Sequence, residues 1–478
     1  MKNLKHDLGL RIVKLIDVLL VTIPFAMCWY MYYSPRIESP FLWRGNALIV
    51  FLFVVLFFAY ARIYDAFLVS LNRISEMIYS QALAIIISDG IMYIILWILT
   101  EHIPNILPAL MALAAQLLFA AIWSFTAHKW YFANFPPKLS AVIYGEREGM
   151  ESLIGEYGLE RKFSIQNVVD INDCKDDLSI LDGIEAVFIS GIHSNDRNRI
   201  LKYCVENSIL VYVIPRVGDT IMSGARPVHM LHLPVLRVGR YSPAPEFLFV
   251  KRLFDIVSSS IALIVTSPVM LVTAIAIKAH DGGPVFYKQC RLTKDRKEFD
   301  VLKFRSMRVD AEKNGVARLS TGDNDDRITP VGRFIRKVRI DELPQLINVL
   351  KGDMSVVGPR PERPEIAAQY EAEMPEFALR LQAKAGLTGY AQVFGKYNTT
   401  PYDKLQMDLM YIAQPKLSEE LRIIFATVKI LFMPESTEGV TEGQTTAAST
   451  KQVEHDESVL NGETADERIN ITEMSLEI

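Results

Sequence analysis

Residues 327–362 read RITPVGRFIRKVRIDELPQLINVLKGDMSVVGPRPE, and this stretch decides the character of the C-terminal half of the chain. Asp341 is placed to cap a helix that tolerates Pro344 in its first turn and ends near Lys351-Gly352. The N-terminus of such a helix carries partial positive charge and free amide donors, which suit a phosphate group. We therefore expect Asp341 to lie where a phosphorylated molecule binds.

The surroundings of this helix are cationic. Met354–Val357 reads as a strand that leads into Gly358-Pro359-Arg360-Pro361, a stiff turn able to present Arg360 bidentately to phosphate oxygens. The alternative is an ordinary capped helix followed by a proline-rich loop. Four basic residues just upstream disfavour that alternative, because they would keep a carboxylate ionised and partly neutralise a phosphate: Arg333, Arg336, Lys337 and Arg339.

A second basic stretch, Lys303–Arg308, follows a predicted strand at Phe299–Leu302 and contributes Lys303 and Arg305. The alternative interpretation is that this basic stretch is a solvent-exposed edge strand without a binding role. The acidic residues Asp323, Asp325 and Asp326 lack EF-hand spacing and indicate a turn rather than a metal site.

No histidine lies between His280 and His455, and no Ser-His-Asp set is evident. Chemistry in this part of the chain must therefore rest on carboxylates, with Arg, Lys and Mg²⁺ as charge partners.

The composition of the 478 residues indicates a mixture of membrane and soluble segments. Half of the residues are apolar and the net charge is −4, but residues 435–478 alone carry −9, which leaves +5 on the rest. We expect this acidic tail to be disordered. A mildly basic body beside apolar segments suits anionic lipids or phosphorylated substrates and disfavours nucleic acid. Four scattered cysteines favour neither disulfides nor zinc, and no cleavable signal sequence is evident.

Four apolar stretches in residues 1–130 are each long enough to cross a bilayer core of roughly 30 Å. The flanking basic residues place both ends of this four-helix transmembrane region in the cytoplasm. Asp17 and Asp89 lie within or at the edge of a stretch, where a functional role and a helix-packing role are equally open. The stretches are Ile16–Tyr33, Ala47–Tyr64, Ala82–Leu99 and Ile106–Thr126.

Residues 139–241 are predicted to form a Rossmann-like α/β domain with parallel strands at Ala141–Tyr144, Ala186–Ser190 and Ile209–Ile214. Gly145 and Gly149 fall short of the G-x-G-x-x-G fingerprint, so the sequence leaves open whether this domain binds a nucleotide.

The apolar segment 253–277 is long enough to span a membrane, but basic clusters flank it on both sides. A full span would place the second cluster outside, against the positive-inside bias. We expect a re-entrant helix that breaks at Ser267-Pro268 and returns to the cytoplasmic side, because Pro268 removes a helical hydrogen bond.

Residues 251–432 resemble the bacterial sugar transferase domain of polyprenyl-phosphate hexose-1-phosphate transferases, the monotopic phosphoglycosyl transferase superfamily. The motifs cover nearly the whole of residues 250–434. The long form of this family has four transmembrane helices and a Rossmann-like domain ahead of an α/β catalytic domain, and this chain matches that layout. The motifs are KRLFDI (251–256), Ser267-Pro268, VLKFRSMR (301–308), DDRITPVGRFIR (325–336), DELPQLINVLKGDMSVVGPRPE (341–362), AGLTGYAQV (385–393) and MDLMYI (407–412).

The resemblance implies an integral enzyme of the bacterial inner membrane whose catalytic domain faces the cytoplasm. It implies that Asp341 attacks the sugar-bearing phosphate of a UDP-hexose, glucose or galactose being expected, and releases UMP. Undecaprenyl phosphate then takes the sugar phosphate, the first membrane step of exopolysaccharide or capsule synthesis. Glu342 and Mg²⁺ assist, with Asp341 and Glu342 as metal ligands, and the implied phosphate contacts are Lys303, Arg305, Arg336 and Arg360.

Two positions depart from the family pattern. Ala385 stands where a proline is usual before Gly386, and Thr293 stands where a glycine is usual. A non-catalytic scaffold is disfavoured by the intact Asp341-Glu342 pair, and an epimerase or dehydratase is disfavoured because no Tyr-x-x-x-Lys follows the incomplete glycine pattern. A homodimer is a further expectation.

Overall fold

The computed structural model describes residues 2–37, 42–174, 177–230, 232–308, 327–395 and 399–431. The acidic tail and Asp323, Asp325 and Asp326 therefore lie outside the described residues. The chain divides into two compact units, one formed by the described parts of residues 1–251 and 409–433 and the other by residues 252–408.

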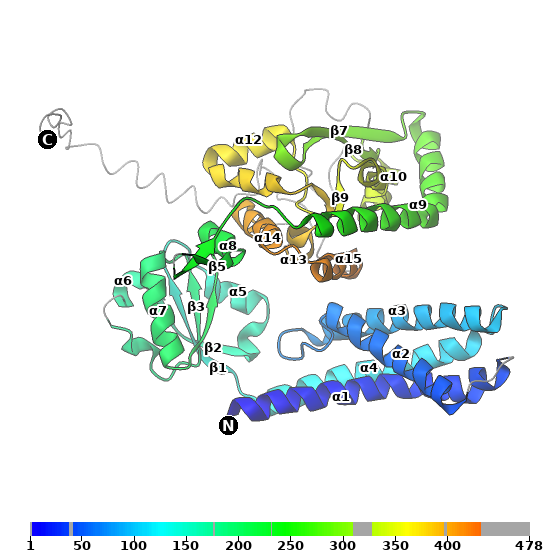
Figure 1. The fold of residues 1–478 in the computed structure, drawn as a ribbon, viewed down its shortest axis with the longest axis horizontal. Helices are drawn as coiled ribbons and strands as arrows, with labels where there is room; N and C mark the ends of the chain where they lie inside the picture. The colour runs from blue at the N-terminus through cyan, green and yellow to red at the C-terminus, as the bar shows by residue number, and fades with distance from the viewer. Residues whose placement is uncertain are drawn as a thin grey trace, which may run out of the picture. The chain divides into compact units, whose positions relative to one another are not determined.

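The first unit begins with long apolar helices. They are α1 (Lys2–Cys28, continued by a π-turn at Trp29–Tyr33), α2 (Trp43–Ile63), α3 (Ile74–Thr100) and α4 (Leu107–Asn134), drawn from blue to cyan in Figure 1. Each overlaps one predicted apolar stretch. The side chains of Phe53, Phe57 and Ile85 are fully buried between them. Gln81 Nε2 donates to Asp17 Oδ2 at 2.6 Å, so this acidic residue joins α1 to α3 inside the bundle.

Five helices in the described residues are long and apolar enough to cross a membrane. They are His6–Arg36, Trp43–Ile63, Ile74–Thr100, Leu107–Asn134 and Pro245–Asp281.

A parallel sheet with strand order β2-β1-β3-β4 follows the bundle. Its strands are β1 (Lys138–Tyr144), β2 (Phe163–Asp170), β3 (Ala186–Ser190) and β4 (Leu210–Val213). The three predicted strands are confirmed as β1, β3 and β4. β2 was not predicted, because its sequence FSIQNVVD has polar residues among the apolar ones, as suits a strand at the edge of the sheet.

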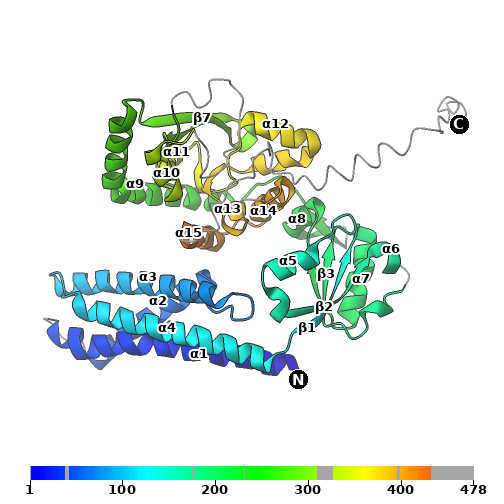
Figure 2. The ribbon, with the colours of Figure 1, turned by 180° about the vertical axis from the view of Figure 1, so that it is seen from behind.

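Helices cover both faces of this sheet (Figures 1 and 2). Alternate residues of a strand point to opposite faces. Ala141 and Ile143 therefore pack with Ile200 of α7, whereas Val142 packs with Ile154 of α5. The bounds are α5 (Met150–Glu156), α6 (Ile171–Cys174), α7 (Ser194–Glu206) and α8 (Val217–Ser223), and an antiparallel hairpin of β5 (Arg226–Met230) and β6 (Leu233–Arg237) follows.

The loops after β1 and β3 meet where the strand order reverses, which is where doubly wound sheets bind ligands. A Cβ on Gly145 would lie 2.8 Å from the carbonyl oxygen of Gly191. Arg216 Nη2 also donates to Glu146 Oε2 at 2.6 Å beside these loops. The first strand thus ends against its neighbour rather than in an open glycine-rich loop.

Helix α9 (Pro245–Asp281) is continuous and contains Pro268. Proline cannot donate to the carbonyl four residues earlier, which is that of Ile264. The hydroxyl of Ser267 donates to this carbonyl at 2.8 Å instead, so the acceptor stays paired. The ribbon of α9 turns sharply part-way along (Figure 1).

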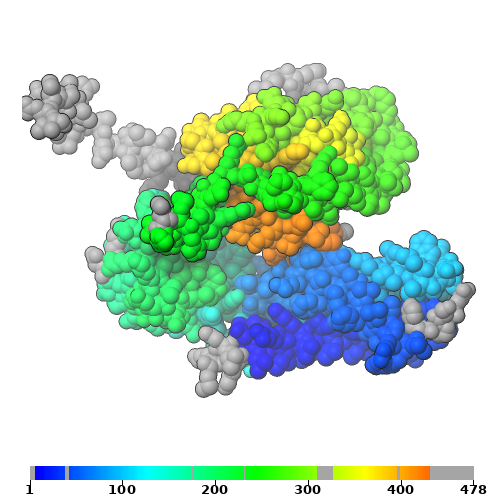
Figure 3. Space-filling model, viewed as in Figure 1, coloured from blue at the N-terminus to red at the C-terminus, as the bar shows by residue number. Residues whose placement is uncertain are grey.

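Most apolar side chains of α9 remain exposed. Ile264 is 73% exposed and Val265 70%. The helix lies at the surface in the space-filling view, in green (Figure 3). An exposed apolar helix of this kind suits a lipid environment.

Polar contacts within the second unit hold α9 against α11 and the strand at Ser355–Val357. Arg252 donates to the carbonyls of Val349 and Leu350 at 2.7 and 2.8 Å, the last turn of α11. Asp255, 4% exposed, accepts from Ser355 Oγ at 2.8 Å and from the backbone N–H of Val356 at 3.0 Å. The KRLFDI motif therefore fastens α9 to the region that carries the candidate carboxylates.

The rest of the second unit is built around short elements. β7 (Phe286–Leu292) pairs antiparallel with β8 (Glu298–Phe304), and β9 (Ser355–Val357) pairs parallel with β10 (Gly386–Thr388). The helices are α10 (Pro330–Lys337), α11 (Gln345–Lys351), α12 (Pro364–Glu373) and α13 (Tyr390–Phe394), with 3-10 helix at Pro375–Gln382. Helix α14 (Pro401–Ala413) begins in this unit and ends in the first, to which α15 (Leu417–Leu431) belongs. The side chain of Asn348 bonds to both the N–H of Leu302 and the carbonyl of Asp300, which fixes α11 against β8.

Candidate active site

Asp341 and Glu342 lie on a short 3-10 turn, Ile340–Glu342, between α10 and α11. The predicted N-cap role of Asp341 is wrong: Pro344 occupies the N-cap of α11. The backbone bonds here run three residues back, from the N–H of Leu346 to Leu343 and from that of Ile347 to Pro344, so the α-helix begins only after this 3-10 segment. Arg339 precedes the turn with a φ of 54°, a left-handed conformation uncommon for residues other than glycine. The structure thus holds both carboxylates on a bent, non-α segment.

The Glu342 carboxylate is held by two cations. Its Oε1 accepts from Lys303 Nζ at 2.9 Å and from Arg360 Nη2 at 3.2 Å, and its side chain is 17% exposed. Burial alone would raise the pKa of Glu342, but Lys303 and Arg360 outweigh burial and hold that pKa well below its usual range. Glu342 is therefore ionised throughout the neutral range.

Asp341 has different surroundings. Among the described residues no hydrogen bond to its carboxylate is formed. Burial and then the negative charge of Glu342 raise the pKa of Asp341 to about 6, against the opposing charges of Lys303, Arg336 and Arg360. Asp341 is thus ionised at neutral pH, without a hydrogen-bond partner and close to cations, which are the properties of a carboxylate nucleophile.

An open pocket adjoins Glu342. Lys303, Val301 and Arg291 reach it from one face of the β7–β8 ribbon, because residues 289, 291, 301 and 303 share a face in that register. Its lining residues are Arg291, Val301, Lys303, Glu342, Gln345, Arg360, Pro361, Gly386, Leu387 and Gln392.

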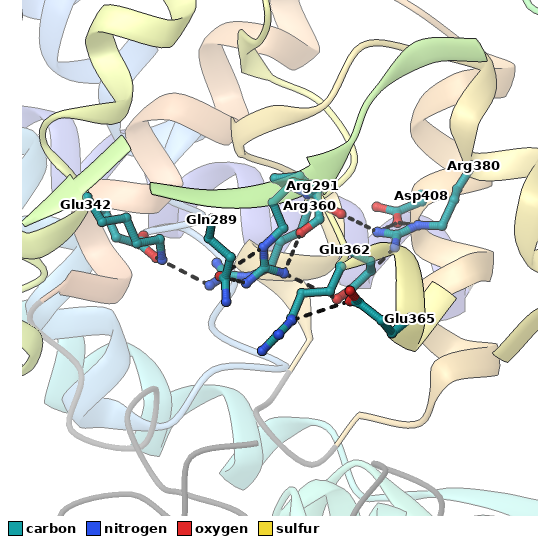
Figure 4. Close-up of polar contacts among 11 residues, drawn as sticks. Gln289, Arg291, Glu342, Arg360, Glu362, Glu365, Arg380 and Asp408 are labelled. Atoms are coloured by element: carbon teal, nitrogen blue, oxygen red, sulfur yellow. Dashed lines mark hydrogen bonds and ion pairs between the residues drawn. The ribbon is translucent and has the colours of Figure 1, made fainter. Parts of the chain in front are cut away.

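Arg291 was missed by the sequence analysis as a residue of this site. Its Nη1 donates to the carbonyl of Pro361 at 3.0 Å and its Nη2 to Gln289 Oε1 at 2.6 Å (Figure 4). Burial lowers the pKa of Arg291, partly offset by Glu362. The alternation of Gln289 and Arg291 along one strand is the signal that could have indicated a shared, functional face.

A buried ion pair supports the Arg360 loop. Arg380, 3% exposed, bonds to Asp408 Oδ2 at 2.6 Å and donates to the backbone carbonyl of Arg360 at 2.8 Å. Glu362 Oε1 lies 3.6 Å from Arg380 Nη1, so the guanidinium contacts two carboxylates (Figure 4). This pair was not predicted from the sequence, although Asp408 within the apolar run MDLMYI was a sign of a buried partner.

Of the predicted site residues, Lys303 and Arg360 both contact Glu342. Asp341 is the neighbour of Glu342 in the sequence, and the charge of Arg336 acts on its carboxylate. Arg305 is placed elsewhere: it is buried and pairs with Asp281 at the end of α9. Ser267 and Pro268 lie in α9, outside the pocket lining.

Residues 247–434 match the sequence model of the bacterial sugar transferases. The UDP-glucose:undecaprenyl-phosphate glucose-1-phosphate transferase of Caulobacter vibrioides is 38% identical over 209 residues, 43% of this chain and 78% of that protein. The exopolysaccharide production protein PSS of Rhizobium leguminosarum bv. phaseoli is 43% identical over 190 residues, 38% of this chain and 94% of that protein. This chain belongs to the bacterial sugar transferase family.

Another bacterial sugar transferase relative is the UDP-N-acetylgalactosamine-undecaprenyl-phosphate N-acetylgalactosaminephosphotransferase of Aeromonas hydrophila. It is 39% identical over 236 residues, 49% of this chain and 55% of that protein. The chain thus spans about half the length of this relative.

The two departures from the bacterial sugar transferase pattern contact one another. The backbone N–H of Ala385 donates to Thr293 Oγ1 at 3.1 Å, and Thr293 Oγ1 donates to the carbonyl of Asp353 at 3.2 Å. A proline at 385 would have no N–H to donate, and a glycine at 293 would have no hydroxyl to accept. The hydrogen bond between these two positions therefore requires both departures.

Asp341 and Glu342 are the carboxylates of this site that could bind Mg²⁺. The described residues hold no group of three or more His, Cys, Asp or Glu side chains arranged for a metal ion. Mg²⁺ is commonly bound by one or two carboxylates together with substrate phosphates and water. Asp341, and the Glu342 oxygen that neither Lys303 nor Arg360 contacts, fit such a shared site.

Proposed function

We propose that this chain transfers hexose 1-phosphate from a UDP-hexose to undecaprenyl phosphate and releases UMP. The observation that supports it most directly is the unequal pair on the 3-10 turn. Glu342 is bound to Lys303 and Arg360, whereas the Asp341 carboxylate has no hydrogen-bond partner among the described residues. The names of the relatives support the same class of reaction.

In the first step, an Asp341 carboxylate oxygen attacks the sugar-bearing phosphorus of the donor. The bond from that phosphorus to the bridging oxygen breaks, UMP leaves with its phosphate, and an acyl phosphosugar remains on Asp341. A phosphate oxygen of undecaprenyl phosphate then attacks the same phosphorus and frees the carboxylate. Lys303 and Arg360 offset the negative charge that develops on the phosphate oxygens, as cations do in phosphoryl transfer.

Mg²⁺, held by Asp341, Glu342 and the diphosphate, would neutralise the leaving phosphate. Glu342 would have a second role in fixing Lys303 and Arg360 beside the donor. Removing divalent cations with EDTA should stop turnover, and adding Mg²⁺ should restore it.

The membrane arrangement belongs to the same proposal. Helices α1–α4 form a transmembrane bundle in a bacterial inner membrane, and the first and last residues of this bundle lie on the cytoplasmic side. Helix α9 is re-entrant. The basic residues on both sides of α9 support this, since the positive-inside bias keeps both flanks on the cytoplasmic side.

The reaction is tested by UMP release from a panel of UDP-sugars that includes UDP-glucose, UDP-galactose and UDP-N-acetylgalactosamine. Steady-state release should depend on undecaprenyl phosphate, because without it each enzyme releases a single UMP and stops at the acyl phosphosugar. The rate should fall by at least a thousandfold in Asp341→Asn, since an amide is a poor nucleophile. Near-normal turnover of Asp341→Asn would exclude the covalent route. Continued turnover beyond one UMP per enzyme without a lipid acceptor would exclude the transfer.

A further inference from the structure

One wall of the active-site pocket carries an amide group that the carboxylate chemistry does not use. Gln392 lies on α13 and lines the pocket together with Gly386 and Leu387. Its Nε2 donates to the backbone carbonyl of Leu387 at 3.1 Å. This contact fixes the orientation of the amide, because the reverse orientation would set two oxygens against each other.

The other end of the same amide has no partner. Gln392 Oε1 is buried and accepts no hydrogen bond in the described part of the chain. Leaving a buried acceptor unpaired is costly, so such a group in a native structure calls for an explanation. Its place in the pocket lining indicates that the missing donor comes from the bound molecule.

The charge of the pocket restricts what that donor can be. Lys303 and Arg360 supply cationic donors suited to phosphate oxygens. An amide oxygen cannot bind an ionised phosphate, which has no proton to donate. It suits a neutral group with an O–H or N–H, and a UDP-hexose offers these on the sugar ring and on the imide N–H of uracil.

We infer that Gln392 Oε1 accepts a hydrogen bond from the neutral part of the donor nucleotide-sugar and determines specificity there. This rests on the proposed function, since it assumes that the pocket binds a nucleotide-sugar. Lys303 and Arg360 then bind the diphosphate, and Gln392 distinguishes the group attached to it.

The test compares Gln392→Met with a matched control, Gln382→Met. Gln382 also donates from Nε2 to a backbone carbonyl, that of Leu379 at 2.9 Å, but it does not line the pocket. In the full-length protein with undecaprenyl phosphate, Gln392→Met should raise the KM for the UDP-sugar about tenfold. Gln382→Met should leave KM within twofold of the wild-type value.

Inhibition by the product UMP shows whether the hydrogen bond to Gln392 comes from uracil or from the sugar. If uracil is the donor, the Ki of UMP should rise by the same factor as KM, and all UDP-sugars should be affected equally. If the sugar is the donor, the Ki of UMP should stay constant and the discrimination between epimeric UDP-hexoses should shrink. Unchanged KM, Ki and sugar preference in a folded Gln392→Met protein would overturn the inference.

A second measurement needs only the wild-type protein, in case Gln392→Met folds poorly. UMP methylated at the uracil imide nitrogen and a series of deoxy UDP-hexoses each lack one donor group. One of them should bind about tenfold more weakly than its parent, and equal binding by all would refute the role of Gln392. Absence of any UMP release by the wild type would instead refute the proposed function.

Discussion

At the scale of single residues, Asp341 and Glu342 are adjacent in sequence but differ in what surrounds their carboxylates. Burial and the charge of Glu342 raise the pKa of Asp341 to about 6. In the proposed reaction the ionised form is the nucleophile, so kcat/KM should fall as the pH drops through about 6 and reach a plateau above it. A pH profile of UMP release under subsaturating UDP-sugar measures this limb.

The same reasoning predicts the direction in which Glu342→Gln moves the limb. The substitution removes the neighbouring negative charge, which lowers the pKa of Asp341, so the acid limb should shift to lower pH even if the maximal rate falls. A limb that stayed in place or moved to higher pH would show that Glu342 does not set the ionisation of Asp341.

At the scale of elements, the buried Arg380–Asp408 pair supports the loop that presents Arg360. Arg380→Met leaves Asp408 unpaired and buried, which should lower the free energy of unfolding by about 3–5 kcal/mol. The double variant Arg380→Met, Asp408→Leu should recover most of this loss, because no lone charge remains buried. Thermal unfolding in detergent compares the three proteins.

Activity should not recover with stability, because the carbonyl of Arg360 still lacks its donor. UMP release by the double variant should stay at least tenfold below wild type. Full activity in the double variant would show that the pair only stabilises the fold and does not position Arg360.

Elements that depend on neighbouring residues could be predicted from the sequence alone. The apolar stretches, the strands at 141–144 and 186–190, and the cationic surroundings of Asp341 could all be predicted from spacing and residue type. The contact between Arg380 and Asp408 could not, because it joins positions 28 residues apart that only the tertiary fold brings together. The cap assigned to Asp341 failed because the segment after it forms a 3-10 turn rather than the first turn of α11.

Thr293 and Ala385 should behave as a coupled pair. Thr293→Val keeps the shape but leaves the N–H of Ala385 and the carbonyl of Asp353 unpaired, at a cost of about 1–3 kcal/mol. Ala385→Pro removes the N–H itself, so it should destabilise the Thr293→Val protein less than it destabilises the wild type. A double-mutant cycle on unfolding free energies measures the difference, and strict additivity would mean that the hydrogen bond contributes nothing.

At the scale of the whole molecule, the proposed re-entrant course of α9 fixes the side of the membrane on which its two flanks lie. Cys290 is exposed on β7, after α9, and Glu246 lies in the first turn of α9. In single-cysteine proteins carrying either Cys290 or Glu246→Cys, a membrane-impermeant maleimide should label both positions in inverted membrane vesicles. Neither should be labelled in intact spheroplasts.

Ile103 provides the matched control for this experiment. It is 75% exposed in the loop between α3 and α4. In a bundle of four spans whose two ends are cytoplasmic, this loop lies outside the cell membrane. Ile103→Cys should therefore be labelled in spheroplasts and protected in inverted vesicles. If Cys290 followed the pattern of Ile103→Cys while Glu246→Cys did not, α9 would be a full span. The carboxylates at 341 and 342 would then lie across the membrane from a cytoplasmic UDP-sugar, and the proposed reaction would lose its donor.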